Sequence, residues 1–201
     1  MYAAQMINSD FHPSALAEIY QKEVSIAVWQ RQLDTHITDY AQWLTSLTPC
    51  FQTRFAQSPA SVAKQLEKEL PLHKNRQLFI QDITLVVDMF ACLFELETVG
   101  LRMAVLKTAM CPKFHVDRVP CRLISTYCGA ATQWHSHEQI QRFENGTLAP
   151  HVNAKPYNLR AGDVALLKGE AWEGNEGRGL VHRSPSASDD NRRLVLTLDF
   201  A

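Results

Sequence analysis

The sequence contains few cysteines, and none of them forms a C-x-x-C pair. The five are Cys50, Cys92, Cys111, Cys121 and Cys128. An odd number without paired spacing argues against a disulfide framework and favours a reducing compartment. The last three are separated by ten and seven residues, which is the spacing of no common zinc module. Ordinary packing is therefore preferred for them over a thiolate zinc site.

The sequence also lacks a long uninterrupted apolar run. A membrane-spanning helix needs about 20 apolar residues, whereas the longest stretch here, residues 83–96, contains Asp88 and Glu95. Residues 1–10 have no basic residue and no sustained apolar segment, unlike a secretory signal. We therefore expect a cytoplasmic protein that has no membrane partner.

Neither positive nor negative charge is in excess. The 20 Lys and Arg residues nearly balance the 21 Asp and Glu residues, for a net charge of -1, and no long block of one sign occurs. Nucleic acid and anionic membranes are therefore not the expected partners. The 201 residues, 46% hydrophobic and 20% charged, are typical of a globular domain with a proper core, which excludes the disordered and fibrous classes.

The first half of the sequence, residues 1–98, is expected to be a helical region. Apolar residues recur there at spacings of three and four, the period of amphipathic helices. Helices are expected over residues 14–20, 33–47, 59–70 and 78–97. The second of these should stop before Pro49, and the last is apolar enough to be buried against a sheet. Residues 24–29 fit either a strand or the start of a helix.

The second half, residues 99–201, is expected to consist of strands, and the two halves should form one compact unit. Strands are expected over residues 101–107, 121–128, 164–168, 180–182 and 193–200. Short strands joined by Gly and Pro turns favour an antiparallel sandwich or barrel over a parallel α/β sheet. The mouth of a barrel is a natural place for a metal and a small ligand.

One short motif, His115-Val116-Asp117, combines metal-ligand chemistry with a suitable spacing. Residues i and i+2 of an extended segment point the same way, so the imidazole and the carboxylate can converge on one point. His182 would add a second nitrogen and leave open positions, as in non-haem Fe(II) sites or catalytic-type Zn(II) sites. The alternatives are a hydrogen-bonded structural pair for His115 and Asp117, and a turn histidine for His182.

The other histidines do not favour a metal site. His135 and His137 are spaced for metal binding but stand in a polar run, residues 133–141, so a solvated loop or a helix start is preferred. The remaining four have no partners in the sequence and are expected at the surface: His12, His36, His73 and His151.

The order of these motifs resembles the double-stranded β-helix of Fe(II)/2-oxoglutarate-dependent oxygenases. A His-x-Asp motif is followed by the turn and strand of residues 159–164, then by His182, and then by an arginine about ten residues on. The resemblance implies an α+β fold in which N-terminal helices pack on a C-terminal double-stranded β-helix, also called a jelly roll or cupin-like fold. It also implies Fe(II) and 2-oxoglutarate as cofactors.

In that superfamily the arginine binds the distal carboxylate of 2-oxoglutarate. Arg192 and Arg193 lie ten and eleven residues after His182, and the guanidinium fork of either suits a carboxylate. Arg193 is preferred, because it shares a strand face with small or hydroxylic residues, while Arg192 alternates with large apolar ones. Tyr127 is a further candidate donor to the co-substrate, although a buried tyrosine with a backbone partner is the commoner outcome.

Three segments together more closely resemble an uncharacterised bacterial family, the domain of unknown function numbered 1826. They are residues 111–117, 127–134 and 182–185. Ala130 and Gln133 depart from this pattern, since Pro and Glu are expected there. That family's reaction is not established, and its genes often lie beside genes of zinc homeostasis.

Three hypotheses follow from the sequence. The first is an oxygenase that acts on a small-molecule or protein substrate. The second is a non-catalytic or zinc-binding protein of the same fold with a role in metal homeostasis. The third is an inert cupin-like module in which the His-Asp-His set is structural. A homodimer is left open, because the helical half can pack on its own barrel or on a second subunit.

Overall fold

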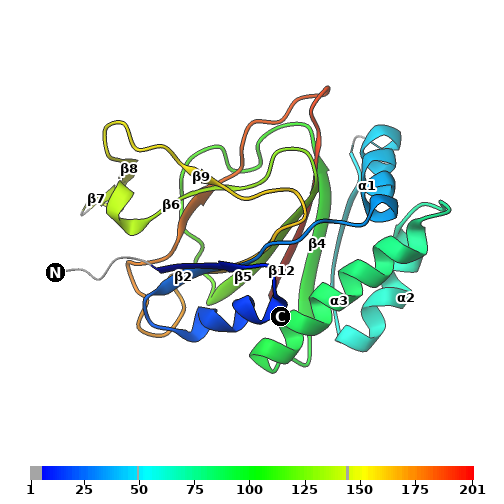
Figure 1. Cartoon of the computed structure of the whole chain (residues 1–201), viewed down its shortest axis with the longest axis horizontal. Coiled ribbons are helices and arrows are strands. Elements are labelled where there is room, and N and C mark those ends of the chain that lie inside the picture. The colour runs from blue at the N-terminus through cyan, green and yellow to red at the C-terminus, as the bar shows by residue number, and fades with distance from the viewer. Residues whose placement is uncertain (1–5, 49, 144) are drawn as a thin grey trace.

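The computed structural model describes residues 6–48, 50–143 and 145–201, which fold into two facing sheets with helices along one side (Figure 1). The helices are η1 (Pro13–Tyr20), α1 (Thr35–Leu47), α2 (Pro59–Glu69), α3 (Arg76–Phe94) and η2 (His137–Gln139). The strands are β1 (Met6–Asp10), β2 (Val24–Trp29), β3 (Gln52–Gln57), β4 (Val99–Leu106), β5 (Cys121–Cys128), β6 (Gln133–His135), β7 (Ile140–Arg142), β8 (Leu148–Pro150), β9 (Tyr157–Asn158), β10 (Val164–Lys168), β11 (Val181–Arg183) and β12 (Arg193–Phe200). Residues 1–5, part of the stretch considered for a signal, and Pro49 lie outside the described residues.

The larger sheet, called the major sheet, has seven strands in the order β1-β2-β10-β5-β12-β4-β3. Only β1 and β2 pair in parallel; the other neighbours are antiparallel. Its centre is β12, which pairs with β4 on one side and β5 on the other. The antiparallel arrangement expected for the second half of the chain is therefore observed.

Both edges of the major sheet come from the first half of the chain, which the sequence predicted to be helical. β1 and β2 extend one edge and β3 extends the other. The ambiguous residues 24–29 are a strand. β3 has the sequence Gln-Thr-Arg-Phe-Ala-Gln, which alternates only weakly between apolar and polar residues, and its long-range pairing with β4 supplies the hydrogen bonds. Residues 1–98 thus contribute strands as well as helices.

The smaller sheet, called the minor sheet, has the order β11-β6-β9, and His115 adds an isolated bridge to His182 of β11. From β5 onward, the chain passes between the two sheets: β6 and β9 lie in the minor sheet, β10 in the major, β11 in the minor and β12 in the major. The hairpin of β7 and β8 is a separate pair between β6 and β9. This winding is the one expected for a double-stranded β-helix.

The two faces of the major sheet have different neighbours because side chains alternate along each strand. Leu194, Leu196 and Leu198 of β12 belong to the core beneath the helices. Val195 lies on the opposite face, in a cluster that also contains Trp134 and Leu180 from the side of the minor sheet. We call this second face the inner face, and Arg193, Thr197 and Asp199 share it by alternation with Val195.

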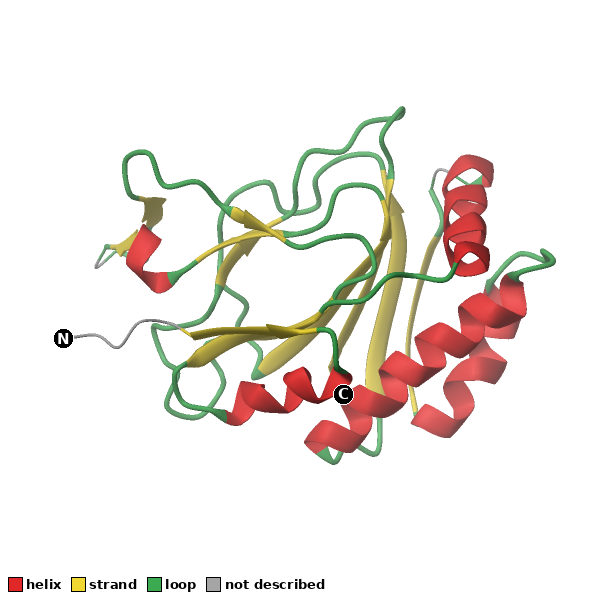
Figure 2. Ribbon diagram, viewed as in Figure 1, coloured by secondary structure: helices red, strands yellow, loops and turns green. Residues whose placement is uncertain are grey.

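The helices η1, α1, α2 and α3 cover the other face of the major sheet (Figure 2). The longest, α3, buries seven residues: Phe79, Ile80, Ile83, Val86, Val87, Phe90 and Ala91. Phe79 packs against Tyr127 of β5, and Phe90 packs against Phe200 of β12. By length and composition α3 is the one helix in the described part of the chain that could cross a membrane. Its contacts with the sheet are those of a core helix, as the sequence predicted.

Candidate metal centre

His115, Asp117 and His182 converge at the edge of the minor sheet. One ligand atom from each lies within 4.8 Å of those of the other two. Nε2 of His115 is 3.8 Å from Oδ1 of Asp117, and Nε2 of His182 is 3.4 Å from Oδ2. In the described part of the chain, this is the group of potential ligands that is close enough to hold a metal, and it contains no cysteine.

Backbone pairing places the two histidines. The amide of His115 donates to the carbonyl of His182 at 3.0 Å, and the amide of His182 donates back at 2.9 Å. Two residues that exchange both hydrogen bonds lie directly opposite each other, with side chains on the same face. The imidazole ring centroids are accordingly 4.5 Å apart. The structure thus brings together the two distant histidines that the sequence analysis grouped.

The hydrogen bonds of the His115 and His182 rings leave the Nε2 atom of each ring available to a metal. Nδ1 of His115 lies 3.0 Å from the carbonyl oxygen of Lys113, and Nδ1 of His182 lies 3.1 Å from that of Leu180. A carbonyl oxygen only accepts, so each Nδ1 carries the proton and each Nε2 keeps its lone pair. Burial also lowers the pKa of His182, which favours the neutral ring.

Arg122 orients the carboxylate of Asp117. Its Nη1 donates to Oδ2 of Asp117 at 2.9 Å, while Nε and Nη2 donate to the carboxylate of Asp199 at 2.7 and 2.9 Å. Burial opposes the charge of Arg122, but the two carboxylates outweigh it and raise its pKa. The sequence analysis missed Arg122 and Asp199, because they are 77 residues apart and meet only through the pairing of β5 with β12.

Gly169, directly after β10, lets the segment after Asp117 pack closely on the end of that strand. A Cβ atom on Gly169 would lie 1.9 Å from the carbonyl oxygen of Val119 and 2.9 Å from that of Asp117. The amide of Glu170 donates to the carbonyl of Asp117 at 2.9 Å. Only glycine permits this approach, so Gly169 helps to position Asp117.

The donor set fits a metal with open coordination positions. Two imidazole nitrogens and one carboxylate oxygen suit Fe(II) and also a catalytic-type Zn(II) site. The carbonyls that fix both tautomers are the outer partners that such ligands require. The imidazole of His115 is one-third exposed, at 33%, whereas that of His182 is 7% exposed. The centre is therefore reachable from one side and enclosed on the other.

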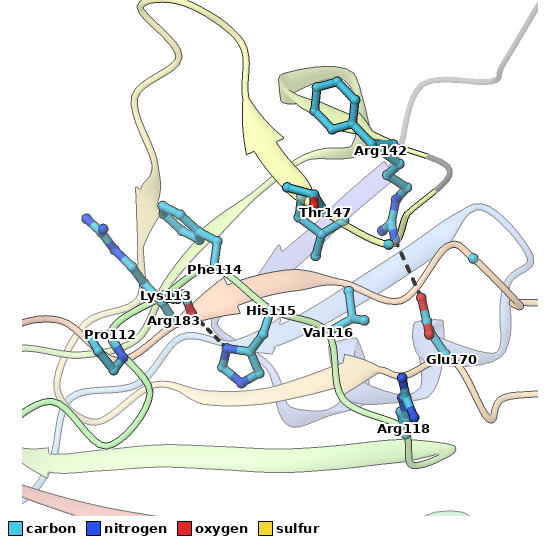
Figure 3. A pocket seen from close by; sticks show the side chains of 14 residues that line it. Pro112, Lys113, Phe114, His115, Val116, Arg118, Arg142, Thr147, Glu170 and Arg183 are labelled. Atoms are coloured by element: carbon cyan, nitrogen blue, oxygen red, sulfur yellow. Dashed lines mark hydrogen bonds and ion pairs between the residues drawn. The ribbon is translucent and has the colours of Figure 1, made fainter.

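A pocket of about 840 Å³ adjoins the His-x-Asp segment (Figure 3). Phe114, His115 and Val116 line one side of it, and the β7–β8 hairpin lines another through Arg142 and Thr147. Figure 3 shows the ring of His115 on the opposite side of its segment from Phe114 and Val116, as expected for extended backbone. Neither Asp117 nor His182 lines this pocket, so it lies beside the His-x-Asp segment, on the side away from the ring of His115.

Arg193 lies on the inner face and is almost completely buried, at 1% exposure. Its Nε donates to the carbonyl of Ala130, and its Nη1 is buried without a hydrogen-bond partner. Burial lowers the pKa of Arg193 to about 10, so the guanidinium is still charged at neutral pH. No carboxylate in the described part of the chain neutralises it. A buried cation of this kind is costly unless a ligand pairs with it.

The structure does not bring Arg192 or Tyr127 to the metal centre. Arg192 donates to the carbonyl of Thr45 at 3.0 Å and lies 3.5 Å from Asp189. The hydroxyl of Tyr127 donates to Asp82 of α3 at 2.7 Å, on the helix face of the sheet. Burial, reinforced by Asp82, raises the pKa of Tyr127, so the hydroxyl remains a donor. Its partner is a carboxylate and not the backbone group suggested by the sequence.

His135 and His137 are also separate from the metal centre. His135 is buried at 1% exposure, where its ring packs 4.5 Å from that of Phe114 and its Nδ1 contacts Gln139. It does not lie in the solvated loop that the sequence suggested, because pairing with Val181 of β11 draws it into the minor sheet. His137 begins the short helix η2, in agreement with the alternative of a helix start.

We expect Tyr127→Phe to destabilise the fold without affecting metal binding. The variant loses a buried hydrogen bond to a carboxylate, which is worth about 1.5–3 kcal/mol. Asp82 keeps its bidentate pair with Arg31, at 2.6 and 2.9 Å. Denaturant unfolding measures the loss of stability, and metal titration measures binding. Unchanged stability together with weakened binding would show that Tyr127 serves the site.

Solved structures similar in fold include oxygenases. The rice dioxygenase for auxin oxidation aligns at a TM-score of 0.52 with 10% identity, over 88% of this chain and 73% of that one. A C-terminally truncated protein of Neurospora crassa in its apo form aligns at 0.52 with 10% identity, over 100% and 98%. The full-length form of that Neurospora crassa protein, in complex with alpha-KG, aligns at 0.51 with 10% identity, over 100% and 88%.

At this identity the likeness concerns the fold alone, and it confirms N-terminal helices packed on a double-stranded β-helix. Among curated proteins, no sequence matches significantly. The sequence does match a family described as "Protein of unknown function (DUF1826)", over residues 10–199. This match covers nearly the whole chain and confirms the resemblance found from the three motif segments. The chain belongs to the DUF1826 family.

Proposed function

We propose that this protein is an Fe(II)/2-oxoglutarate-dependent oxygenase, with iron held by His115, Asp117 and His182. The observation that carries the proposal is the buried, unpaired guanidinium of Arg193. It shares the inner face of β12 with Asp199, and Asp199 is joined through Arg122 to Asp117. A cation without a protein counter-ion, on the face that meets the metal centre, suits an anionic co-substrate.

In the proposed function, different residues bind the metal and the co-substrate. His115, Asp117 and His182 hold the metal, and Arg193 binds the distal carboxylate of 2-oxoglutarate. The apolar cluster between the sheets limits water near Arg193, which strengthens its attraction to a carboxylate. When bound, iron and 2-oxoglutarate supply the oxidative decarboxylation to succinate and CO₂ that accompanies oxidation of a substrate by dioxygen.

Anaerobic reconstitution tests the proposal. Protein loaded with Fe(II) should develop a weak visible absorption band when 2-oxoglutarate is added, and succinate should form when air is admitted. Glutarate is the matched control, because it has both carboxylates but lacks the 2-oxo group that completes the chelate, so it should give no band. Absence of both the band and succinate would contradict the oxygenase proposal.

A zinc-binding protein of the same fold, with a role in metal homeostasis, is the second candidate. The same three donors suit a Zn(II) site that has an open position, which favours this alternative. Metal analysis of protein purified without added metal separates the two candidates. Stoichiometric zinc that is not displaced by Fe(II), in protein whose melting temperature does not respond to 2-oxoglutarate, would support the zinc protein. That alternative gives Arg193 no ligand.

A further inference from the structure

A second cavity, of about 480 Å³, lies where β3 and β4 form the edge of the major sheet. Its wall includes Arg54 of β3, Arg102 of β4 and Arg122 of β5, together with Thr197 and Asp199 of β12. Along β4, Leu101 and Met103 face the core beneath the helices. Arg102 therefore points to the inner face, and we call this cavity the inner-face pocket.

A single side chain, that of Arg122, connects the inner-face pocket to the metal centre. Arg122 lines the pocket and also donates to Asp117 at 2.9 Å. Its two remaining donors engage both carboxylate oxygens of Asp199, which also lines the pocket. Both carboxylate oxygens of Asp199 are thus engaged by Arg122, which also pairs with Asp117, and Asp199 forms no ion pair with the other charged residues of the pocket.

Arg54 and Arg102 are those other charges. They are direct cross-strand neighbours in the pairing of β3 with β4, and like charges in this position destabilise a sheet. Neither forms an ion pair or a side-chain hydrogen bond within the described part of the chain. Nε of Arg102 is, moreover, buried without a hydrogen-bond partner. Arg54 is exposed and Arg102 is partly buried, and two adjacent guanidinium groups without a counter-ion suit an oxyanion.

We propose that the inner-face pocket binds the substrate of the metal centre, and that this substrate carries a carboxylate or phosphate group held by Arg54 and Arg102. This inference rests on the proposed oxygenase function, because it assigns the substrate of the same centre. The hydroxyl of Thr197, whose residue lies directly opposite Arg102 on β12, adds a neutral donor to the pocket. The oxyanion is distinct from 2-oxoglutarate, which belongs to Arg193.

Anion binding to the metal-free, full-length protein tests the pocket independently of any oxygenase activity. The probes are inorganic phosphate and acetate, each titrated at constant ionic strength against chloride, with binding followed by NMR chemical shifts and melting temperature. We expect saturable binding of one or both. The double variant Arg54→Gln/Arg102→Gln should weaken it by about tenfold or more, and Arg192→Gln, which removes the same kind of charge on the helix face, should not.

The double variant also provides a check on folding. Relief of the like-charge pair should leave the melting temperature of the ligand-free protein unchanged or higher. A lower melting temperature would contradict the view that the pair is held for a ligand. The single variants Arg54→Gln and Arg102→Gln keep the test informative, since each should weaken anion binding while retaining one guanidinium.

Competition with 2-oxoglutarate separates the pocket from the co-substrate site. Saturating 2-oxoglutarate should leave phosphate or acetate bound, and Arg193→Met should not weaken these anions. If 2-oxoglutarate displaces the anion and Arg193→Met no longer binds it, the anion belongs to Arg193 and the proposal is overturned. Equal anion binding by the wild type and the double variant would also overturn it. So would the absence of anion binding by the wild type. If the anion binds as expected but Fe(II) and 2-oxoglutarate give no absorption band, the pocket stands and the oxygenase function fails.

Discussion

Replacing Arg193 by methionine should strongly weaken 2-oxoglutarate binding while leaving the ligand-free protein at least as stable. Methionine retains most of the length and apolar volume of the side chain but has no charge. Losing one partner of a buried charge pair costs about 2–5 kcal/mol, so the Kd for 2-oxoglutarate should rise by about 30-fold or more. Calorimetric titration of the metal-loaded protein measures this change.

The stability of Arg193→Met distinguishes a ligand site from a structural role. Arg193 is 1% exposed, and no carboxylate pairs with it in the described part of the chain. Its removal therefore relieves the desolvation of an unpaired cation, although one hydrogen bond to Ala130 is lost. Arg192→Met is the matched control and should keep co-substrate binding. A large loss of stability in Arg193→Met with unchanged 2-oxoglutarate binding would contradict our assignment.

Replacing His182 by alanine should abolish stoichiometric metal binding. His182 supplies one of three ligand atoms, and its Nε2 is held in the unprotonated form by the carbonyl of Leu180. Loss of an outer partner of a ligand already weakens metal binding by about 10–100-fold, so loss of the ligand itself should exceed about 100-fold. Metal content after gel filtration and titration with Fe(II) or Zn(II) provides the measurement.

His135→Ala is the control for His182→Ala. His135 lies in the neighbouring strand β6 and is buried to a similar degree, but its Nδ1 contacts Gln139 and it is not among the three converging ligands. It should keep full metal content at some cost in stability, because its alanine variant leaves a cavity beside Phe114. Stoichiometric metal in His182→Ala would exclude the proposed ligand set.

Several elements could be predicted from the sequence because their signals are local. The strands expected over residues 121–128 and 193–200 coincide with β5 and β12. The helix expected from Ser58-Pro59 begins there because proline fits the first helical position. These patterns depend on residues within one or two turns of each other. The edge strands β1 and β3 have weaker patterns and required their pairing partners.

For the candidate site too, some features could be predicted from local sequence and others required the structure. His-x-Asp on one face of an extended segment is a local property, and the motif order was sufficient to add His182. The sequence preferred Arg193 to Arg192 as the residue that binds the co-substrate, and this assignment stays a prediction. The structure adds that Arg193 is buried without a counter-ion. Tyr127 was a weaker candidate, and its side chain faces Asp82 of α3 instead.

The sequence by itself therefore determined the class of fold, the family, and the three residues most suited to a metal. Periodicity indicated the helices and the antiparallel strands, and the resemblance carried by the motifs implied the double-stranded β-helix and the family. Only the tertiary structure decided which charges are compensated: Arg122 by Asp117 and Asp199, and neither Arg193 nor the pair Arg54 and Arg102 by any carboxylate in the described part of the chain. The physical reason is that the register of long-range strand pairing, and the desolvation that follows from it, fix the neighbours of each charge.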